Sequence, residues 1–436
     1  MKRRNSFVAV LALSSLFLTG SACQEKPGER PGPEATLEKI ELEAGTIYKY
    51  TMPAAGTAID RYDEAVAVAC VQGLVNRKSP CFYVVNPSSR ATKFWLEAAT
   101  VDGGWAGGRK ETEIKSFKDV LRLGMNVVKG VIIWDPAVPA SLNVANTMAG
   151  LEDAVVMSPE MADKYAADCG WKIIKDFRGQ FTGKETGSAK NDAYRWAIRE
   201  FMDKGLVNTH LMCLYEDSFW AREKGDLGYV VTRDWAVYGK CFVYDLSPWG
   251  DEQPKDDLGQ RLGLDLETYK MLLSSLLKQT GGVYGTEVAG FFCFNKYSNN
   301  GGYYSKHDPV PTEWENVYVI SPYNCYQNTV ASSCYNQSFH SQAPKRAMKQ
   351  GRPEAGPGPQ KGKTYIAYLM ADYDSATPLY DFLINQNIWT DKNRGKMPLL
   401  WGLNPNLSET YPDLFQYLYT GPVDLIKSKS ACIHVH

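Results

Sequence analysis

The sequence predicts an α/β protein, with several small α/β domains followed by a barrel-like C-terminal domain. Apolar runs of strand length alternate with segments of helical periodicity up to about residue 160. The same alternation returns over about 206–288, and a third segment rich in expected strands begins near residue 289. Such alternation is typical of parallel sheets covered by helices, and a chain of 436 residues exceeds the usual size of one domain.

The first segment begins with an expected helix over 58–80, where apolar residues recur at helical spacing. The buried strand CFYVVN (81–86) follows it directly. Further helices are expected over 116–126, 140–151 and 190–206, and further strands over 128–135 and 153–158. The order of these elements predicts a parallel α/β layer.

The second and third segments contain six expected strands and one long helix. The strands are HLMCLY (210–215), CFVYDLS (241–247), GFFCFN (290–295), VYVIS (317–321), TYIAYLM (364–370) and MPLLWGL (397–403). The helix covers 266–279 and ends at Gly281-Gly282. Residues 341–363 are rich in Pro, Gly and Lys, which predicts a solvated loop or insertion.

The N-terminus has the layout of a bacterial lipoprotein signal. The positive segment Lys2-Arg3-Arg4 precedes an apolar run over 7–18, which is too short to span a bilayer. Small residues follow, and then Cys23, which we expect to be lipidated, so that the secreted chain is anchored at the outer membrane, the cell surface or in the periplasm. An ordinary secretory signal is the alternative. Residues 24–36 predict a disordered tether.

Composition argues against several function classes. The formal net charge is −1 and no basic block occurs, so the chain lacks the electrostatic footprint of a nucleic-acid-binding protein. Only five His and no C-x-x-C pair argue against a multi-His metal site and against a zinc site, and we expect no cofactor and no metal. Cys325 and Cys334 are candidates for a disulfide in an oxidising compartment.

The stretch KTYIAYLMADYDSATPLYDFL (363–383) has two carboxylates at the point where an expected buried strand leaves its sheet. Side chains alternate along a strand, so Asp372 and Asp374 face the same side if extended geometry continues that far. The alternative is structural, because Asp374 or Ser375 is also suited to cap the following helix.

Three other expected strands end in polar residues. These residues are Asn295-Lys296-Tyr297, Tyr323-Asn324 with Asn328, and Asn404-Pro405-Asn406. A helix separates the strands at 365–370 and 397–403, so we expect these two strands to be parallel neighbours in a βαβ unit. Ligands of α/β barrels and sheets bind at the carboxyl ends of strands, which predicts a site on one rim of a barrel-like domain.

Six short motifs occur along the chain in a fixed order. They are VQGLVNR (71–77), FNKY (294–297), VPTEW (310–314), SPYN (321–324), MADYDSA (370–376) and PLLWGLNPNL (398–407). Together they resemble the GxGYxYP family, which is described as glycoside hydrolases of bacterial secreted proteins and lipoproteins. The similarity covers most of residues 45–420, and VQGLVNR is similar to a signature of the family's first N-terminal domain. The resemblance implies small N-terminal α/β domains followed by a barrel-like C-terminal domain.

The chain departs from the family after the NPN strand. The Gly-x-Gly-Tyr-x-Tyr-Pro motif that names the family is absent there, and the sequence runs YLYTGPVDLIKSKSACIHVH (417–436) instead. We therefore expect an incomplete C-terminal domain and an aberrant tail. The expected organisation is a signal peptide (1–22), a tether (23–40), α/β domains (41–105, 106–205 and 206–288), the C-terminal domain (289–421) and the tail (422–436).

The resemblance implies an enzyme that hydrolyses glycans with two carboxyls, one acting as acid and one as base or nucleophile. The candidate catalytic residues are Asp372, Asp374 and Glu313. Asp372 and Asp374 are close in sequence, so we expect one of them to pair with Glu313 or with a carboxylate beyond the NPN strand. The candidate substrate-binding residues are Lys296, Tyr297, Tyr323, Asn324, Trp401, Asn404 and Asn406, although Trp401 lies in an apolar run that favours the core.

Two other functions stay open. Asp372 and Asp374 are also suited as hard oxygen ligands in a metal-assisted carbohydrate deacetylase or esterase, although the scarcity of His argues against such a site. A non-catalytic glycan-binding surface lipoprotein has the same cleft without turnover. Two carboxyls that face each other across a cleft distinguish the glycosidase from both. The expected partners are a glycan and, through Cys23, the membrane.

Overall fold

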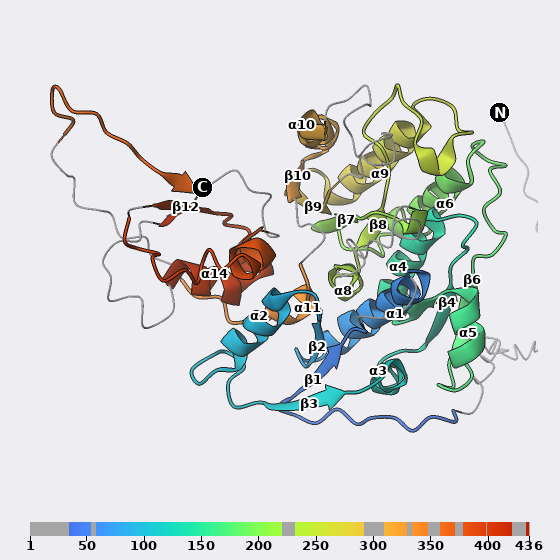
Figure 1. Ribbon diagram of the computed structural model, residues 1–436. Coiled ribbons are helices and arrows are strands. Elements are labelled where there is room, and N and C mark those ends of the chain that lie inside the picture. Colours follow the sequence, from blue (N-terminus) through green and yellow to red (C-terminus); the bar gives the residue numbers. More distant parts are fainter. Residues whose placement is uncertain are drawn as a thin grey trace, which may run out of the picture. The chain divides into compact units, whose positions relative to one another are not determined.

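The computed structural model describes residues 35–53, 58–219, 232–291, 309–328, 334–347, 358–370, 378–397, 399–420 and 433–435, all within one compact unit. These residues form a mixed α/β fold in which four small sheets of parallel strands pack with helices (Figure 1). The predicted α/β class is confirmed, whereas the barrel-like arrangement stays a prediction. No helix within these ranges is long and apolar enough to cross a membrane.

The first sheet has the strand order β2-β1-β3. Its strands are β1 (Thr46–Thr51), β2 (Phe82–Val85) and β3 (Lys110–Ile114), and its helices are α1 (Ala58–Asn76) and α2 (Arg90–Thr100). Ser89 caps α2 because its hydroxyl accepts a hydrogen bond from Ala91 N. Strand β3 pairs with β1, so the domain boundary expected after residue 105 falls inside this sheet.

The second sheet has the strand order β5-β4-β6. Its elements are α3 (Phe117–Gly124), β4 (Gly130–Ile133), α4 (Ala140–Glu152), β5 (Val155–Met157), α5 (Pro159–Tyr165), β6 (Lys172–Asp176) and α6 (Ala189–Ala197). Serine hydroxyls cap the starts of α3, α5 and α6. The helix expected over 190–206 is shorter, since α6 passes into a π-helical turn over Ile198–Met202.

The third sheet has the strand order β10-β9-β7-β8. Its elements are β7 (Leu211–Leu214), α8 (Arg233–Tyr238), β8 (Phe242–Tyr244), α9 (Leu264–Thr280), β9 (Thr286–Gly290), α10 (Pro309–Ile320) and β10 (Cys325–Asn328). Of the strand predicted at GFFCFN (290–295), Gly290 is the last residue of β9, and residues 292–295 lie outside the described residues. Two strands, β7 and β8, match their predicted positions.

The strand predicted at VYVIS (317–321) is wrong, because these residues form the end of α10 and the turn after it. An apolar run of this length does not distinguish a strand from a helix. In the structure Ile320 is buried while Tyr318 is 76% exposed, as expected on a helix that packs through one face. The strand that does follow is β10, which begins four residues later.

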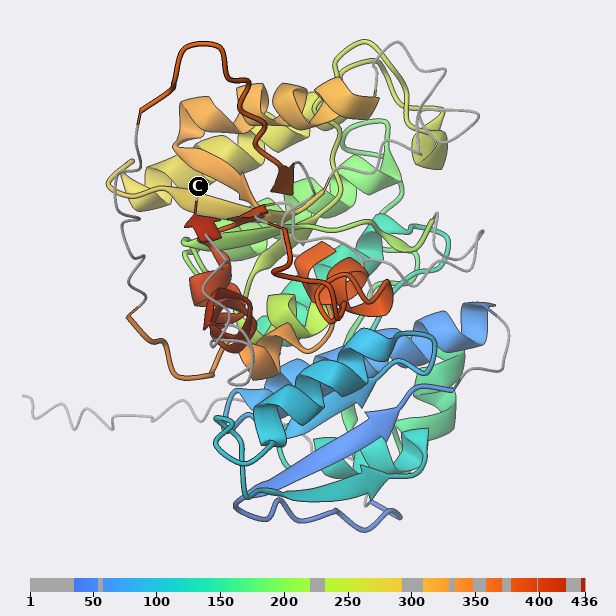
Figure 2. The same ribbon diagram turned by 60° about the vertical axis from the view of Figure 1, so that its left-hand side comes forward.

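The third sheet is doubly wound. The chain adds β8 on one side of β7, and it then returns to add β9 and β10 on the other side. Helix α8 lies on one face of the sheet, and α9 and α10 lie on the other (Figures 1 and 2). The strand order therefore reverses between β7 and β9, which is the topological switch point of this sheet.

The fourth sheet has the strand order β11-β12-β13. Its strands are β11 (Leu369–Met370), β12 (Leu400–Leu403) and β13 (Ile433–Val435), and its helices are α12 (Leu383–Asn385), α13 (Leu407–Thr410) and α14 (Pro412–Thr420). The parallel pairing of β11 with β12 confirms the predicted relation of these strands. Within the expected aberrant tail, Ile433–Val435 form β13, which pairs with β12.

The stretch TYIAYLM is not the buried strand that the sequence predicts. Only its last two residues are in β11, and Tyr365 and Ile366 are 60% and 73% exposed. The reason lies in the sheet order, since β11 is an edge strand and in the described residues only β12 pairs with it.

The motif VQGLVNR lies in the last turns of α1, and its amide side chains pair with buried backbone groups. Asn76 accepts hydrogen bonds from Cys81 N and Phe82 N and donates to Phe82 O, at 3.1, 2.9 and 3.0 Å. Gln72 donates to Phe82 O at 3.2 Å and to Asn336 Oδ1 at 2.6 Å. The motif therefore fixes the start of β2. It also binds Asn336, which lies more than 250 residues away in sequence.

Two further residues of the motif, Gly73 and Arg77, join α1 to the helices α4 and α8. At Gly73 an added Cβ would lie 2.5 Å from Asp234 O, so the absence of a side chain permits the close approach of α8. The Arg77 guanidinium donates to Gly150 O, Val237 O and Tyr238 O and forms an ion pair with Asp153 at 2.7 Å. The carbonyl groups at the ends of α4 and α8 thus gain partners that their own helices do not supply.

We predict that Gly73→Ala lowers the free energy of unfolding by roughly 1–3 kcal/mol, the usual cost of an extra carbon in a packed contact. Ala is favoured over Gly inside a helix by about 1 kcal/mol, so a loss of stability reports on the contact with α8. Urea unfolding measures the change. Gly259→Ala is the control, because an added Cβ there has no neighbour within 4 Å. An unchanged or more stable Gly73→Ala would contradict the packing of α1 against α8.

Candidate functional site

A row of polar side chains lies along one edge of the third sheet. Because its strands are parallel, their carboxyl ends lie on the same edge, which we call the carboxyl edge. Glu216 and Asp217 follow β7, Asp245 follows β8, and Asn328 ends β10. Ligands of open α/β sheets bind outside the carboxyl ends of strands at a switch point, so the edge between β7 and β9 is a candidate site.

A glycine marks the switch point. Gly290 ends β9 with a φ of +107°, which residues with a side chain rarely adopt, and an added Cβ would overlap Leu214 O. Strands β7 and β9 therefore approach each other closely where the two connections diverge. Lys296 and Tyr297, which the sequence places after this strand, lie outside the described residues.

The acids after β7 and β8 are buried and joined to each other. Asp217 and Asp245 are 0% and 2% exposed. Asp217 N donates to Asp245 Oδ2 at 3.0 Å, and Asp217 Oδ1 accepts from Phe219 N at 3.0 Å. Buried carboxylates are uncommon unless they have partners or a chemical role. The first of these bonds joins the backbone after β7 to the Asp245 carboxylate after β8.

Arg233, at the start of α8, brings positive charge to the same edge. Its Nη1 donates to Asn143 Oδ1 at 2.9 Å and Asn146 Oδ1 at 2.6 Å, and its Nη2 donates to Glu216 O at 2.6 Å. Helix α8 connects β7 to β8, so its first turn lies at the carboxyl edge. The buried guanidinium offsets part of the negative charge that the acids bring.

Asp234 follows Arg233 and is fully buried. Burial raises its pKa to about 6, and the hydrogen bond that Ser338 N donates to Oδ2 at 2.9 Å opposes this shift. Asp234 is 0% exposed, so its raised pKa reflects burial in the contact of α8 with α1 and with Ser338.

Asn406 from the fourth sheet reaches strands of the third. The Glu287 carboxylate accepts hydrogen bonds from Asn328 Nδ2 at 2.8 Å and from Asn406 Nδ2 at 3.1 Å. Asn328 Nδ2 also donates to Asn406 Oδ1 at 2.8 Å. These three side chains form an amide–carboxylate cluster that joins β9 and β10 to the loop after β12.

Asn404 and Asn406 follow β12, as the sequence predicts, and Asn404 Oδ1 accepts a hydrogen bond from Asn406 N at 2.9 Å. Since β11 pairs with β12 in parallel, the chain after β11 leaves the fourth sheet on the same edge. Asp372 and Asp374 come from that part of the chain, and both lie outside the described residues. Their positions stay a prediction.

Tyr323 and Asn324 lie at the opposite edge from Asn328. Asn324 precedes β10, and its carbonyl accepts a hydrogen bond from Thr286 N, at the start of β9, at 2.9 Å. The expectation that they share a rim with Asn406 is wrong, because it depends on a strand at VYVIS that is a helix. Only Asn328, four residues further on, reaches that rim.

Trp401 is buried in the core. It is 4% exposed and packs edge-on against Trp389, with ring centroids 4.9 Å apart. This placement favours the core role that its apolar run indicates over a sugar-stacking platform. Glu313 lies in α10, near the helix start that follows β9, and therefore toward the carboxyl edge.

The acids missed by the sequence analysis carry a recognisable signal. LMCLYED and CFVYDLS are apolar runs that end in acids, the same pattern that draws attention to Asp372. Glu287 has no such signal, because it lies inside a strand. Among the described residues, no group of three or more His, Cys, Asp or Glu side chains is arranged to hold a metal ion. Cys325 and Cys334 are buried free thiols.

Two family models match this chain. One is described as the GxGYxYP_N second domain and covers residues 128–205, and the other is described as the GxGYxYP putative glycoside hydrolase C-terminal domain and covers residues 362–422. Both matches support the assignment of the chain to the GxGYxYP family. No curated protein matches it.

A solved structure also resembles this chain. It is described as a putative hydrolase from Bacteroides thetaiotaomicron VPI-5482, with a TM-score of 0.63 and 15% sequence identity. The match covers 93% of this chain and 64% of that one, so the chain spans less than two thirds of its neighbour's length. At this identity the likeness shows a shared fold.

The two matched GxGYxYP domains lie on either side of the third sheet in sequence. The second N-terminal domain contains the sheet β5-β4-β6, and the C-terminal match contains β11, β12 and α14. Asn406 belongs to the C-terminal match, whereas Glu287 and Asn328 lie between the matches. The amide–carboxylate cluster therefore brings the C-terminal GxGYxYP domain to the third sheet.

We predict that Glu287→Ala and Asn406→Ala are coupled by about 1 kcal/mol in a double-mutant cycle. Hydrogen bonds to charged groups contribute about 1.5–3 kcal/mol when buried, and Glu287 is only half-buried. Urea unfolding of both single variants and the double variant gives the coupling. The control cycle combines Glu287→Ala with Lys39→Ala, because Lys39 is an exposed lysine far from Glu287 in sequence. Additivity of the first pair within about 0.5 kcal/mol would exclude the contact.

Proposed function

We propose that this GxGYxYP protein is a glycoside hydrolase that acts on glycans at the cell envelope through two carboxyls. The observation that supports the proposal most is the parallel pairing of β11 with β12. It means that the acids after β11 and the amides after β12 leave the sheet on one edge. The description of the matching C-terminal domain as a glycoside hydrolase agrees with this chemistry.

In this proposal one of Asp372 and Asp374 acts with Glu313, one as the acid and the other as the base or nucleophile. The start of α10 follows β9, which sets Glu313 toward the carboxyl edge of the neighbouring sheet. Asn404 and Asn406 bind sugar hydroxyls, and Lys296 and Tyr297 contribute from the connection after β9. The hydrogen bonds from Asn406 and Asn328 to Glu287 hold the amides in one orientation, so less side-chain freedom is lost on binding.

A second candidate is a glycan-binding protein without turnover. The amide–carboxylate cluster favours it, because amides and carboxylates bind sugar hydroxyls whether or not a bond is broken. The two candidates differ in the fate of the glycan, so one series of variants separates them.

We predict that Asp372→Asn and Asp374→Asn each reduce glycan hydrolysis by about 10²-fold or more, the usual contribution of a general acid or base. Asn caps a helix about as well as Asp, so these substitutions remove the charge and keep any structural role. Released reducing ends are measured on a panel of glycans, with thermal unfolding as the check on folding.

Hydrolysis by both variants at the parental rate would refute the assignment of these carboxyls. Glycan binding without hydrolysis by the parent protein would favour the binding protein instead. Activity that is lost with a chelator and restored by a divalent cation would favour a metal-assisted deacetylase or esterase.

We also propose that Cys23 carries a lipid that anchors the protein at the outer membrane or cell surface, since Cys23 follows a signal-like segment. Cys23→Ala should move the protein from the membrane fraction to the soluble fraction of the host bacterium, because the lipid supplies the membrane affinity. Immunoblots of the two fractions measure this. A parent protein that is already soluble would show that the segment is an ordinary secretory signal.

A further inference from the structure

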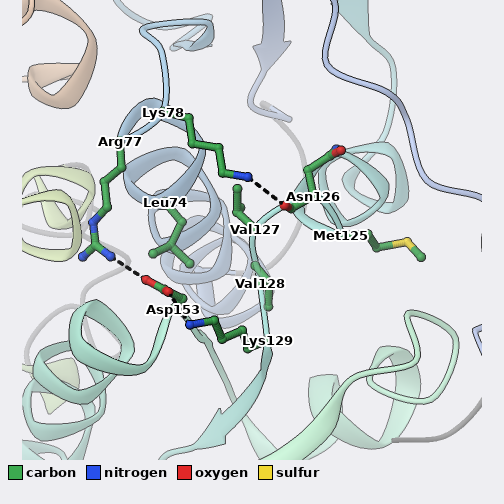
Figure 3. Close-up of a pocket in the computed structure, with 9 residues that line it drawn as sticks. All are labelled: Leu74, Arg77, Lys78, Met125, Asn126, Val127, Val128, Lys129 and Asp153. Atoms are coloured by element: carbon green, nitrogen blue, oxygen red, sulfur yellow. Dashed lines mark hydrogen bonds and ion pairs between the residues drawn. The ribbon is translucent and has the colours of Figure 1, made fainter.

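A cavity of about 430 Å³ lies where the ends of α1, α3 and α4 meet the start of β4, and none of the proposed catalytic residues lines it (Figure 3). Its floor is apolar. Leu74 and Val128 are buried, and Met125 and Val127 are half-buried beside them. Pockets that bind small molecules have about 300–1,000 Å³, so the volume of this cavity lies in the range of ligand sites.

The rim of the cavity is charged, and positive charge is in excess. The charged lining residues are Arg77, Lys78 and Lys129 and one carboxylate, Asp153. Asp153 Oδ1 is 2.7 Å from Arg77 Nη1, and its Oδ2 is 2.8 Å from Lys129 Nζ, so both of its oxygens are occupied. Arg77 is also engaged by backbone carbonyls, which leaves the two lysines as the groups with donors to spare.

The two lysines differ in their partners. Lys78 Nζ donates to Asn126 O at 3.3 Å, and among the described residues it forms no ion pair. Lys129 shares Asp153 with Arg77, and its side chain is 68% exposed. In the view of Figure 3 the Lys78 and Lys129 side chains lie on opposite sides of the apolar residues of the floor. An anion above this floor can therefore meet an ammonium group from either side.

We propose that this cavity binds a small organic carboxylate, with its apolar part on the floor and its carboxylate on the ammonium group of Lys78 or Lys129. An ammonium group holds a carboxylate by charge and by its three donors, and the floor removes the apolar part of the ligand from water. A neutral molecule of the same shape lacks the charge interaction with the ammonium group. A bare inorganic anion lacks the apolar part that the floor removes from water. The site is independent of the proposed hydrolase chemistry.

The proposal is tested with hexanoate as the probe and the full-length protein, by calorimetry or ligand-observed NMR at low salt. We expect hexanoate to bind at least tenfold more tightly than acetate, which lacks the apolar part, and than hexan-1-ol, which lacks the charge. Sulfate should bind no more tightly than acetate. Equal affinities for hexanoate and acetate, or no binding of hexanoate, would overturn the proposal.

Three variants locate the site. Lys78→Met and Lys129→Met keep the apolar part of each side chain and remove its charge, so each should weaken hexanoate binding severalfold and the double variant tenfold or more. Asp153→Asn removes the one negative charge and should strengthen binding. Lys110→Met, which removes an exposed lysine outside the cavity, is the matched control. Unchanged hexanoate affinity in the double lysine variant, with normal thermal unfolding, would overturn the assignment to this cavity.

Discussion

The buried backbone groups at the start of β2 need hydrogen-bond partners, and α1 supplies them. Asn76 pairs with the amides of Cys81 and Phe82 and with the carbonyl of Phe82. An unpaired buried backbone group costs about 1–3 kcal/mol, so this one side chain removes a penalty comparable with a large part of a domain's stability. Because the same amide also donates to Ser338 Oγ at 2.9 Å, the start of the first sheet and the segment before the C-terminal match are held by one residue.

The segment around α11 (Gln337–His340) extends this connection. The Asn336 carboxamide pairs with both Val84 N and Val84 O, at 2.7 and 2.9 Å, and so replaces a neighbouring strand at the edge of the first sheet. Four residues on, buried His340 lies with Nδ1 2.7 Å from Asp413 Oδ2 in α14. Polar groups buried at both ends of the segment favour one arrangement of the sheets, because any other leaves them without partners. The hydrogen bond between Asn406 and Glu287 forms in this arrangement of the sheets.

In the N-terminal part β2, β4 and β5 could be predicted from sequence, because they are short apolar runs, whereas β1, β3 and β6 contain charged residues and could not. In the C-terminal part β7, β8 and β12 match expected strands, but α10 does not. The run at VYVIS has the composition of a strand, but the helix that contains it exposes Tyr318 and buries Ile320. This burial depends on the packing of α10 against β10 and of the turn after α10 against α9. Glu287 could not be predicted from sequence either, since one acid inside a strand gives no periodic signal. Its role arises only when Asn406, over 100 residues later, is placed beside it.

The motif of α1 affects both the carboxyl edge and the cavity. Gly73 permits the contact with α8, whose first residue, Arg233, crosslinks the asparagines of α4 with the chain after β7. One turn further, Arg77 binds the carbonyl groups that end α4 and α8 and forms part of the cavity rim. The residues that the sequence analysis recognises as a family signature are thus structural, and they act on the candidate site through α8. A signature of this kind identifies the fold, whereas the chemistry that we propose depends on acids and amides at the strand ends.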